Sequence, residues 1–284
     1  MTADSSGRVL LSSREIGLMR QAGLVVWEAH QAASRLLEPG ISTAELDAAI
    51  EGVFRRHEAL PLFLGYPGKT PFPAVSCISV NEQVVHGIPG PRILEDGDIV
   101  SIDTGCKING WCGDAALTHA VGEIGDQARR LLRATCDVLN LAIEQMAVCR
   151  MWSEVARQMQ ARVEDAGFSV VTSMVGHAIG QEMHLPPQVP NYFDPAWAEE
   201  EDFGLRPGVV LAVEPMVNAG SGDLKHLPDH WTTVSADGSL SAHFEHTIAI
   251  TRDGCRRLTG PPSNEQEREG LPDWLQDESS WTIW

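Results

Sequence analysis

The chain has 284 residues, of which 43% are hydrophobic, and a net charge of −18 with a pI near 4.8. This length can form one large core or two fused halves, and the acidic balance argues against nucleic acid or an anionic membrane as a partner. No apolar run reaches the roughly 18 residues of a membrane span, and no signal-peptide stretch opens the chain. The six cysteines lack C-x-x-C spacing, so free thiols and a cytoplasmic location are expected.

Two helices are predicted near the N-terminus, each opened by an S-x-x-E capping box. The box at residues 12–15 starts the first helix, which runs to Pro39-Gly40. The box at residues 42–45 starts the second, which continues to about Ala59. Both carry apolar residues at helical spacing, so each is expected to bury one face.

A Pro/Gly-rich loop at residues 60–73 follows the second helix. Its apolar and aromatic members, which include Phe63, Tyr66 and Phe72, are unusual for a solvated loop. They either pack on the core of the domain or line a pocket. A strand at residues 74–80 then leads to His86.

Residues 98–118 predict a β-hairpin, because Asn109-Gly110 fits a type I′ turn. In that register Gly105 faces Asp114, and Asp103 is a diagonal neighbour of Asp114 on the same face, with Cβ atoms roughly 7–8 Å apart. Gly105 leaves the space beside them empty. The two carboxylates can close on one cation; alternatively, they are solvated acids on an exposed hairpin.

The second half of the chain predicts a helix at residues 123–149, another from Ser153 to Gly167, and strands at 168–175, 209–217 and 241–254. These strands and the segments beside them carry further histidines and acids. The residues concerned are His177, His184, Glu214 and Glu245.

An internal repeat relates the two halves at a shift of 111 residues. At this shift Ser42 lands on Ser153, Gly97 on Gly208, and Asp103 on Glu214. The apolar pattern before Asp103 also lands on the one before Glu214. We therefore expect two halves that face each other across a pseudo-two-fold axis, with their acidic strands meeting at the centre.

The predicted organisation has three parts. Residues 1–11 form a flexible N-terminus, residues 12–259 a single catalytic domain, and residues 260–284 an acidic, flexible tail. Within the domain the halves cover about 12–122 and 123–259. The mixture of helices and hairpin-connected strands favours an α+β fold.

The duplication brings together four carboxylates and one imidazole: Asp103, Asp114, His177, Glu214 and Glu245. Such a set would be intolerable in a core without countercharge. Two divalent cations would balance the four negative charges, and mostly oxygen ligands with one nitrogen suit Mn, Fe, Co or Zn. Two ions about 3.5–4 Å apart can share a water and lower its pKa, which generates a hydroxide nucleophile.

The chain resembles the type I methionine aminopeptidases, which have the pita-bread fold that is also found in aminopeptidase P, prolidase and creatinase. The resemblance covers roughly residues 10–255. It rests on NEQVVHGIPG, DIVSIDTG with WCGDAALT, GHAIG with QEMHLPPQVPNY, LAVEPMVN, and SAHFEHTIAI. It implies duplicated halves around a central antiparallel sheet that is covered by helices.

The resemblance also implies roles for individual residues. The five-residue set would bind a dinuclear metal centre, and Glu214 would in addition shuttle a proton. His184 would stabilise the oxyanion, and His86 would lie near the scissile amide. The pocket for the methionine side chain would be formed by Phe63, Tyr66, Cys77, Met183 and Trp231.

Three residues depart from the pattern of this family near the proposed site. Ala178 stands where the family usually has glycine, so a positive φ there would be strained. Leu185 and Pro186 follow His184 where the family usually has two acids. No ligand is lost, but rate or substrate choice could differ.

The expected function is therefore a metal-dependent aminopeptidase. It would remove the N-terminal methionine from nascent proteins by attack of a metal-bridging hydroxide on the first peptide bond, with a small second residue preferred. One alternative is an imidopeptidase of the prolidase or aminopeptidase P type, although those carry an extra N-terminal domain for which the capping box at Ser12 leaves no room. The other is a non-catalytic pita-bread binding protein. The expected state is a monomer that uses nascent N-termini as substrates, and binding to the ribosome is left open.

Overall fold

The computed structural model describes residues 2–3, 9–268 and 271–272. The helices are α1 (Ser13–Ser34), α2 (Thr43–Arg56), α3 (Asp126–Met146), α4 (Trp152–Asp165), α5 (Pro195–Glu200) and α6 (Glu265–Arg268). The strands are β1 (Thr2–Ala3), β2 (Val9–Leu10), β3 (Leu60–Pro61), β4 (Ser76–Val80), β5 (Gln83–Val85), β6 (Ile99–Ile108), β7 (Trp111–Ala120), β8 (Ser169–Val170), β9 (Gly176–Ala178), β10 (Leu185–Val189), β11 (Val210–Val213), β12 (Met216–Asn218), β13 (Leu224–His226), β14 (Thr233–Ser235), β15 (Ser241–His243), β16 (Glu245–Thr251) and β17 (Gly254–Arg257).

A nine-stranded antiparallel sheet runs through the centre of the molecule. Its order is β10-β9-β11-β16-β7-β6-β3, with β17 added to β16 and β4 added to β6. The first half contributes β6 and β7, the second half contributes β11 and β16, and the two halves join where β7 pairs with β16. Two three-stranded sheets, β15-β12-β8 and β13-β14-β5, lie beside it. The α+β class and the central antiparallel sheet are thus confirmed.

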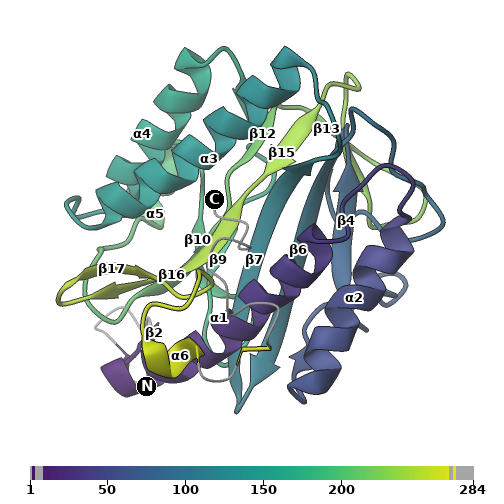
Figure 1. Cartoon of the computed structure of the whole chain (residues 1–284). Coiled ribbons are helices and arrows are strands. Elements are labelled where there is room, and N and C mark those ends of the chain that lie inside the picture. Colours follow the sequence, from purple (N-terminus) through teal and green to yellow (C-terminus); the bar gives the residue numbers. More distant parts are fainter. Residues whose placement is uncertain (1, 4–8, 269–270, 273–284) are drawn as a thin grey trace.

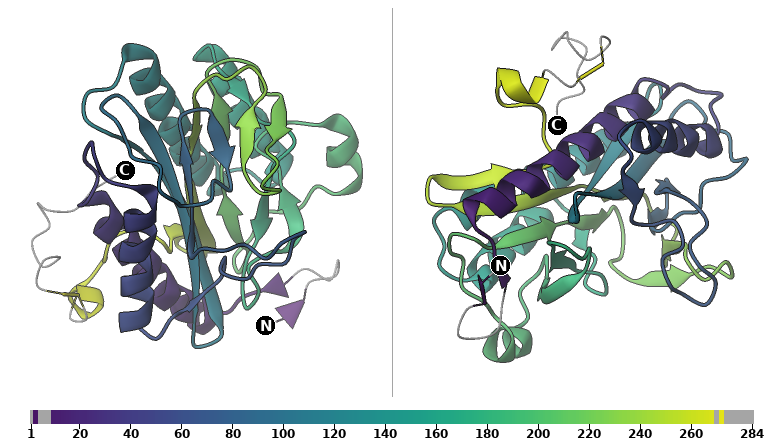
Figure 2. Two further views of the ribbon diagram at one scale, coloured as in Figure 1. Left: turned by 90° about the vertical axis from the view of Figure 1, so that its right-hand side faces the viewer. Right: turned by 90° about the horizontal axis from the view of Figure 1, so that it is seen from below.

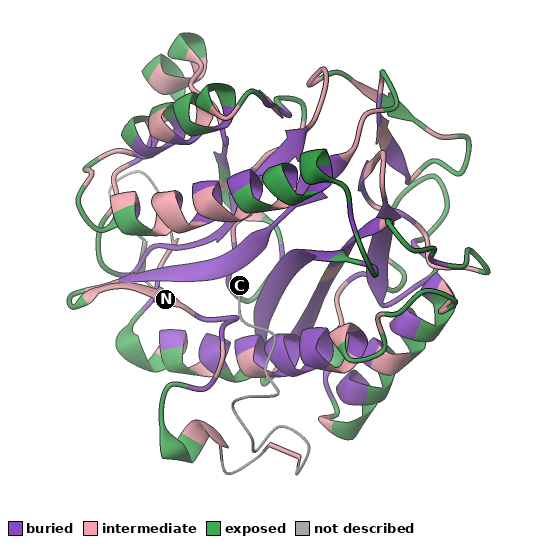
Figure 3. Ribbon diagram, turned by 45° about the horizontal axis from the view of Figure 1, so that its top comes forward, coloured by how far each residue is buried: buried purple, intermediate pink, exposed green. Residues whose placement is uncertain are grey.

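One pair of helices covers each half of the sheet (Figure 1). α1 packs on β6 and β7 and against α2, whereas α3 packs against α4 and reaches β15 and β12. The helix faces that meet the strands are buried and the outer faces are exposed (Figure 3). Both predicted capping boxes form: the Ser12 and Ser42 side chains accept hydrogen bonds from the Glu15 and Glu45 backbone nitrogens at 3.3 Å.

The 111-residue shift holds where β6 and β11 begin but not for the second helix pair. Gly97 and Gly208 both adopt positive φ, at 97° and 101°, and β6 and β11 both begin two residues later. The second helix pair departs from the shift, because α4 begins at Trp152 with Met151 as N-cap. Ser153 therefore lies inside this helix and does not start it, which corrects its match with Ser42.

His30, on the buried face of α1, connects this helix to the sheet. The ring is 1% exposed, and Nε2 lies 3.0 Å from the Ala115 carbonyl oxygen in β7. Burial lowers the pKa of His30 from 6.5 to about 4, and the bond to Ala115 offsets this only in part. The folded protein therefore holds a neutral imidazole where the unfolded chain would take up a proton.

Acid is expected to destabilise the protein through His30. Between pH 6.5 and about 4 the unfolded state binds the extra proton, so stability falls as pH falls. The loss due to His30 is about 2 kcal/mol between pH 7 and 5. Denaturant unfolding at both pH values should show a pH effect smaller by this amount in His30→Gln, whose amide can still donate to Ala115. An equal pH effect in the two proteins would contradict this account.

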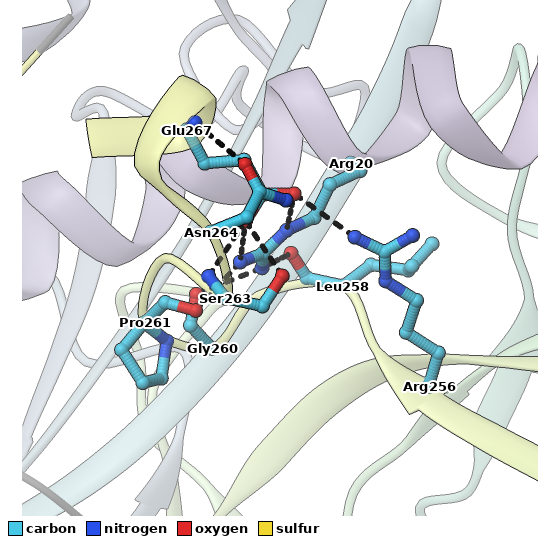
Figure 4. Close-up of polar contacts among 8 residues, drawn as sticks. All are labelled: Arg20, Arg256, Leu258, Gly260, Pro261, Ser263, Asn264 and Glu267. Atoms are coloured by element: carbon cyan, nitrogen blue, oxygen red, sulfur yellow. Dashed lines mark hydrogen bonds and ion pairs between the residues drawn. The ribbon is translucent and has the colours of Figure 1, made fainter. Parts of the chain in front are cut away.

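After β17 the chain crosses α1 and is held there by Arg20 (Figure 4). The Arg20 side chain is 5% exposed and donates to the backbone carbonyls of Leu258, Gly260 and Pro261 at 2.6–2.8 Å. It also pairs with Glu267 of α6 at 2.8 Å. Residues 260–268 are thus fixed to the domain, whereas Trp274, Leu275, Trp281 and Trp284 of the predicted flexible tail lie outside the described residues, as do residues 4–8 of the predicted flexible N-terminus.

None of the helices in the described ranges has the length and apolar character needed to cross a bilayer.

Candidate metal centre

The strand register places the predicted metal ligands on one face of the sheet. Ala116 of β7 pairs with Asp103 of β6 on one side and with Glu245 of β16 on the other, so these side chains share a face. Asp114 lies two residues before Ala116 and therefore points the same way.

The second half supplies the remaining two ligands by the same rule. Ala212 of β11 pairs with Thr247 of β16 and with His177 of β9. Thr247 lies two residues after Glu245, and Glu214 lies two residues after Ala212, so all of them project from the same face. One ligand atom each from Asp114, His177 and Glu245 lie within 4.8 Å of one another, a spacing that could hold a metal ion.

Gly105 makes room for one of these acids. A Cβ atom at this position would lie 2.8 Å from Asp114 Oδ1, so the carboxylate occupies the space that the glycine leaves open. The predicted pairing of Gly105 with Asp114 is confirmed. Thr247, from the other half, fixes the backbone of Asp114. Its hydroxyl accepts a hydrogen bond from the Asp114 backbone nitrogen at 3.1 Å and donates one to the Asp114 backbone carbonyl oxygen at 2.8 Å.

His177 is oriented to offer Nε2 to the acids. Its Nδ1 lies 3.1 Å from the Ala178 carbonyl oxygen, which can only accept, so Nδ1 carries the proton. Nε2 is then a lone-pair donor, and it lies 3.6 Å from Glu214 Oε1. Backbone hydrogen bonds of this kind commonly orient histidines that bind metals.

Without a cation the four carboxylates resist ionisation. Burial, followed by the negative charges of the neighbouring acids, raises the pKa of Asp103 and Glu245 well above their ordinary range. Burial and Asp114 do the same to the pKa of Glu214, and burial raises the pKa of Asp114 to about 7. The site therefore has a strong requirement for positive charge.

The donor atoms fit divalent metal ions. Within the described residues, three buried carboxylate oxygens have no hydrogen-bond partner: Asp103 Oδ1, Asp114 Oδ1 and Glu245 Oε1. Leaving such atoms unpaired is costly in a folded protein. A set of carboxylate oxygens with one imidazole nitrogen is what Mn, Fe, Co and Zn accept, so the residues present match the expected cofactor.

A cavity of about 300 Å³ opens above this face of the sheet. Its lining contains all of the predicted site residues: Phe63, Tyr66, Cys77, His86, Asp103, Asp114, His177, Met183, His184, Glu214, Trp231 and Glu245. The lining contains five further residues, of which the sequence suggested only Phe72 as a possible pocket residue: Phe72, Val85, Met174, Val175 and Met216.

His184 lies beside the acids and is held by Tyr66. The Tyr66 hydroxyl is 2.8 Å from His184 Nδ1, and the rings of His184 and His177 have centroids 4.3 Å apart. With Nδ1 engaged by the phenol, Nε2 is the nitrogen available to a ligand. Burial lowers the pKa of His184, which favours a neutral imidazole that can donate one hydrogen bond.

His86 reaches the cavity from a strained backbone. Its φ is 59°, in the left-handed region that non-glycine residues rarely adopt. Such strain is typical of functional positions. Burial, followed by the charges of His184 and His226, lowers the pKa of His86 to about 4.

Two loops enclose the apolar end of the cavity. Figure 2 shows the blue loop that begins after β3 and the yellow-green β13–β14 hairpin on the side of the sheet away from α1 and α2. Trp231 Nε1 donates to the Thr70 carbonyl oxygen at 3.0 Å, and the Trp231 ring packs edge-on against Phe72 and Tyr66. The aromatic residues of the loop therefore do both things that were expected as alternatives: they pack in a small apolar cluster, and they line the pocket.

The three sequence departures are accommodated. Ala178 lies in β9 and is not among the described residues with positive φ, so the anticipated strain is absent there. Leu185 pairs with Ala178 at the start of β10, and Pro186 follows it.

Among the lining residues that the sequence did not suggest, Met216 could have been placed at the site, since it lies two residues after Glu214 in a segment that reads as one extended strand.

Comparison with known proteins agrees with this architecture. Residues 17–252 match the model of metallopeptidase family M24. The chain belongs to metallopeptidase family M24. This M24 chain is 47% identical to methionine aminopeptidase 1 of Bacillus subtilis, over 87% of this chain and 96% of that protein. It is 41% identical to methionine aminopeptidase 1 of Mycobacterium tuberculosis, over 87% and 93%.

Solved structures of the M24 family give the same result. Methionine aminopeptidase from Thermotoga maritima superposes with a TM-score of 0.83 at 38% identity, covering 89% of this chain and 99% of that one. Prolidase from Pyrococcus horikoshii shares the fold with a TM-score of 0.70 at 22% identity, and only 64% of its chain is covered. The likeness to prolidase thus shows the pita-bread fold alone.

Proposed function

We propose that this M24 protein is a methionine aminopeptidase that removes the N-terminal methionine from nascent polypeptides. The observation that carries the proposal is a cavity with two ends. One end holds four carboxylates and a histidine, and the other is apolar. Close similarity along almost the whole length of methionine aminopeptidases supports the same activity.

Asp103, Asp114, His177, Glu214 and Glu245 would hold two divalent ions, chosen from Co, Mn, Fe and Zn. When bound, such ions lower the pKa of water and polarise the scissile carbonyl. The chain contributes their placement, because four of the five residues lie in strands of one sheet and Glu214 directly follows a fifth strand, β11. It also contributes a cavity in which these acids are largely buried.

The remaining polar residues would handle protons and charge. Water adds to the carbonyl carbon, and Glu214 accepts the proton that this water loses. Nε2 of His184 donates to the oxygen that becomes negative, which stabilises the tetrahedral intermediate. The C–N bond then breaks, and Glu214 passes its proton to the nitrogen of the departing amine. His86, near this nitrogen, assists the proton transfer.

The apolar end would select methionine. Phe63, Tyr66, Cys77, Met183 and Trp231 surround a space suited to an unbranched thioether, and sulfur packs well against aromatic rings. Burial raises the pKa of the Cys77 thiol well above its ordinary value, so this residue lines the pocket as a neutral, weakly polar group.

The proposed substrate also suggests a location and a partner. A protein that acts on new N-termini would work in the cytoplasm, and the ribosome is a candidate partner because the substrate emerges there; we propose that the protein acts as a monomer. Co-sedimentation with ribosomes would test that association, and gel filtration would test the monomer.

The test of the function is peptide hydrolysis by the metal-loaded protein. Met-Ala-Ser should release free methionine, and Met-Lys-Ser should be cleaved at least about tenfold more slowly, since a methylene-scale steric conflict costs 1–3 kcal/mol. A Xaa-Pro dipeptide serves as the control for imidopeptidase activity. Cleavage of the dipeptide without release of methionine from Met-Ala-Ser would overturn the proposal.

A further inference from the structure

A buried histidine lies behind the metal centre. His243, the last residue of β15, is 2% exposed and does not belong to the cavity lining. Thr118 of β7 fixes its backbone: the His243 nitrogen donates to the Thr118 hydroxyl, which in turn donates to the His243 oxygen, both at 2.8 Å. The ring is therefore carried on a rigid support.

The ring faces Glu214. His243 Nε2 lies 3.6 Å from Glu214 Oε2, while Glu214 Oε1 lies 3.6 Å from His177 Nε2. The Glu214 carboxylate is thus placed between two imidazoles that come from different strands. One of them, His177, is at the cavity surface, and the other, His243, is on the inner side.

A coordinated break in two strands creates this arrangement. The chain leaves β11 at Glu214-Pro215 before entering β12, and it leaves β15 at Phe244 before entering β16. The Phe244 nitrogen donates to the Pro215 oxygen at 3.3 Å, so the two breaks lie side by side. Phe244 packs into the core, and the residues on either side of it, His243 and Glu245, both lie beside the acids. Figure 1 shows β15 running on into β16 at this point.

The geometry leaves one polar atom unexplained. His243 Nε2 is buried and has no hydrogen-bond partner among the described residues. Leaving such a group unpaired is costly in a folded protein. At 3.6 Å the contact with Glu214 is longer than a formed hydrogen bond, and contacts at active sites commonly tighten when ligands bind.

We propose that His243 is a positioning residue for Glu214, to which its Nε2–H donates a hydrogen bond when the carboxylate holds a divalent ion. The inference rests on the proposed metal-dependent function. The bond would fix Glu214 from behind, which leaves its other oxygen for the metal and for the proton that it moves. Partners of this kind typically contribute a factor of 10–100 to metal affinity or activity.

The donor role predicts a specific order among three variants. His243→Leu removes the donor, and His243→Asn retains an amide too short to reach Glu214 from the same backbone. His243→Gln can place an amide N–H near the position of Nε2. We expect Leu and Asn to weaken Mn²⁺ binding about 10–100-fold and Gln to stay within about threefold of the wild type, since it restores one hydrogen bond.

The experiment is calorimetric titration of each metal-free protein with Mn²⁺, followed by kcat and KM on Met-Ala-Ser. His30→Leu is the matched control, because it also removes a buried histidine but lies on α1. It should lower Tm without changing Mn²⁺ affinity. In the His243 variants kcat should fall with affinity at subsaturating metal, while KM for the peptide stays the same.

The outcomes separate the two proposals. A wild-type protein that binds no Mn²⁺ would overturn the function itself. If the wild type binds and the Leu and Asn variants bind equally well, His243 only fills the core and the inference fails. If Gln binds as weakly as Asn, the imidazole is not acting as a donor, and the inference fails as well. Should the Leu variant not fold, the comparison of Gln with Asn still decides.

Discussion

Replacing Asp103 with asparagine should lower kcat/KM for Met-Ala-Ser by at least about 10³-fold, because a ligand to a catalytic metal supports several kcal/mol of transition-state stabilisation. The side chain keeps its shape but loses the negative charge that would balance the proposed cation. The metal-free variant should be more stable than the metal-free wild type, since it removes a buried carboxyl group whose ionisation is opposed by burial and by the neighbouring acids. Metal content, activity and Tm measured on the same preparation would show both effects.

Asp47→Asn is a suitable control for this variant. Asp47 is also a partly buried acid near β4, but it accepts hydrogen bonds from the backbone and hydroxyl of Ser76 at 2.9 and 2.7 Å and is not part of the cavity. It should retain metal and activity. Full turnover by Asp103→Asn at wild-type metal content would exclude a role for Asp103 as a ligand.

Replacing His184 with alanine should lower kcat about 10²–10³-fold and change KM little, the effect of losing one donor to an oxyanion. Tyr66→Phe should have a much smaller effect. It removes the phenol that engages His184 Nδ1 at 2.8 Å, and a lost hydrogen bond of about 1 kcal/mol corresponds to roughly fivefold. Steady-state kinetics at saturating metal would measure both.

Comparing the kinetic effects of His184→Ala and Tyr66→Phe shows which side chain contacts the reacting atoms. If Tyr66→Phe were as damaging as His184→Ala, the phenol itself would have to contact the reacting atoms. If His184→Ala changed KM and left kcat intact, the imidazole would bind the substrate without stabilising the transition state. Either result would require a different assignment of the oxyanion donor.

The hairpin could be derived from sequence because its signal is local. Asn109 and Gly110 take positive φ values of 52° and 81°, as a type I′ turn demands, and the pairing of Ile108 with Trp111 then fixes every other pair along β6 and β7. Asp103 and Asp114 were placed on one face by counting alone. The two capping boxes were also predicted from local four-residue patterns, and both form in the structure.

The strand breaks could not be derived in this way. Residues 209–217 and 241–254 each looked like one continuous strand, but Glu214-Pro215 and Phe244 interrupt them. The interruptions depend on each other through a backbone hydrogen bond between segments about thirty residues apart. His243 also received no role from the sequence, although alternation along the predicted strand puts it on the same face as Glu245, two residues later.

The pairing of β7 with β16 determines when, during synthesis of the chain, the proposed ligands of the two halves can come together. Ala116 meets Glu245 across this join, and Glu245 lies close to the end of the described domain. A nascent chain that has emerged only as far as α4 displays Asp103 and Asp114 without His177, Glu214 or Glu245. The chain between the ligands of the first half and those of the second half must close into a long loop before the complete set can bind a metal. The five proposed ligands are therefore together only after Glu245 has left the ribosome, so an ion that needs all five would bind no earlier than that point.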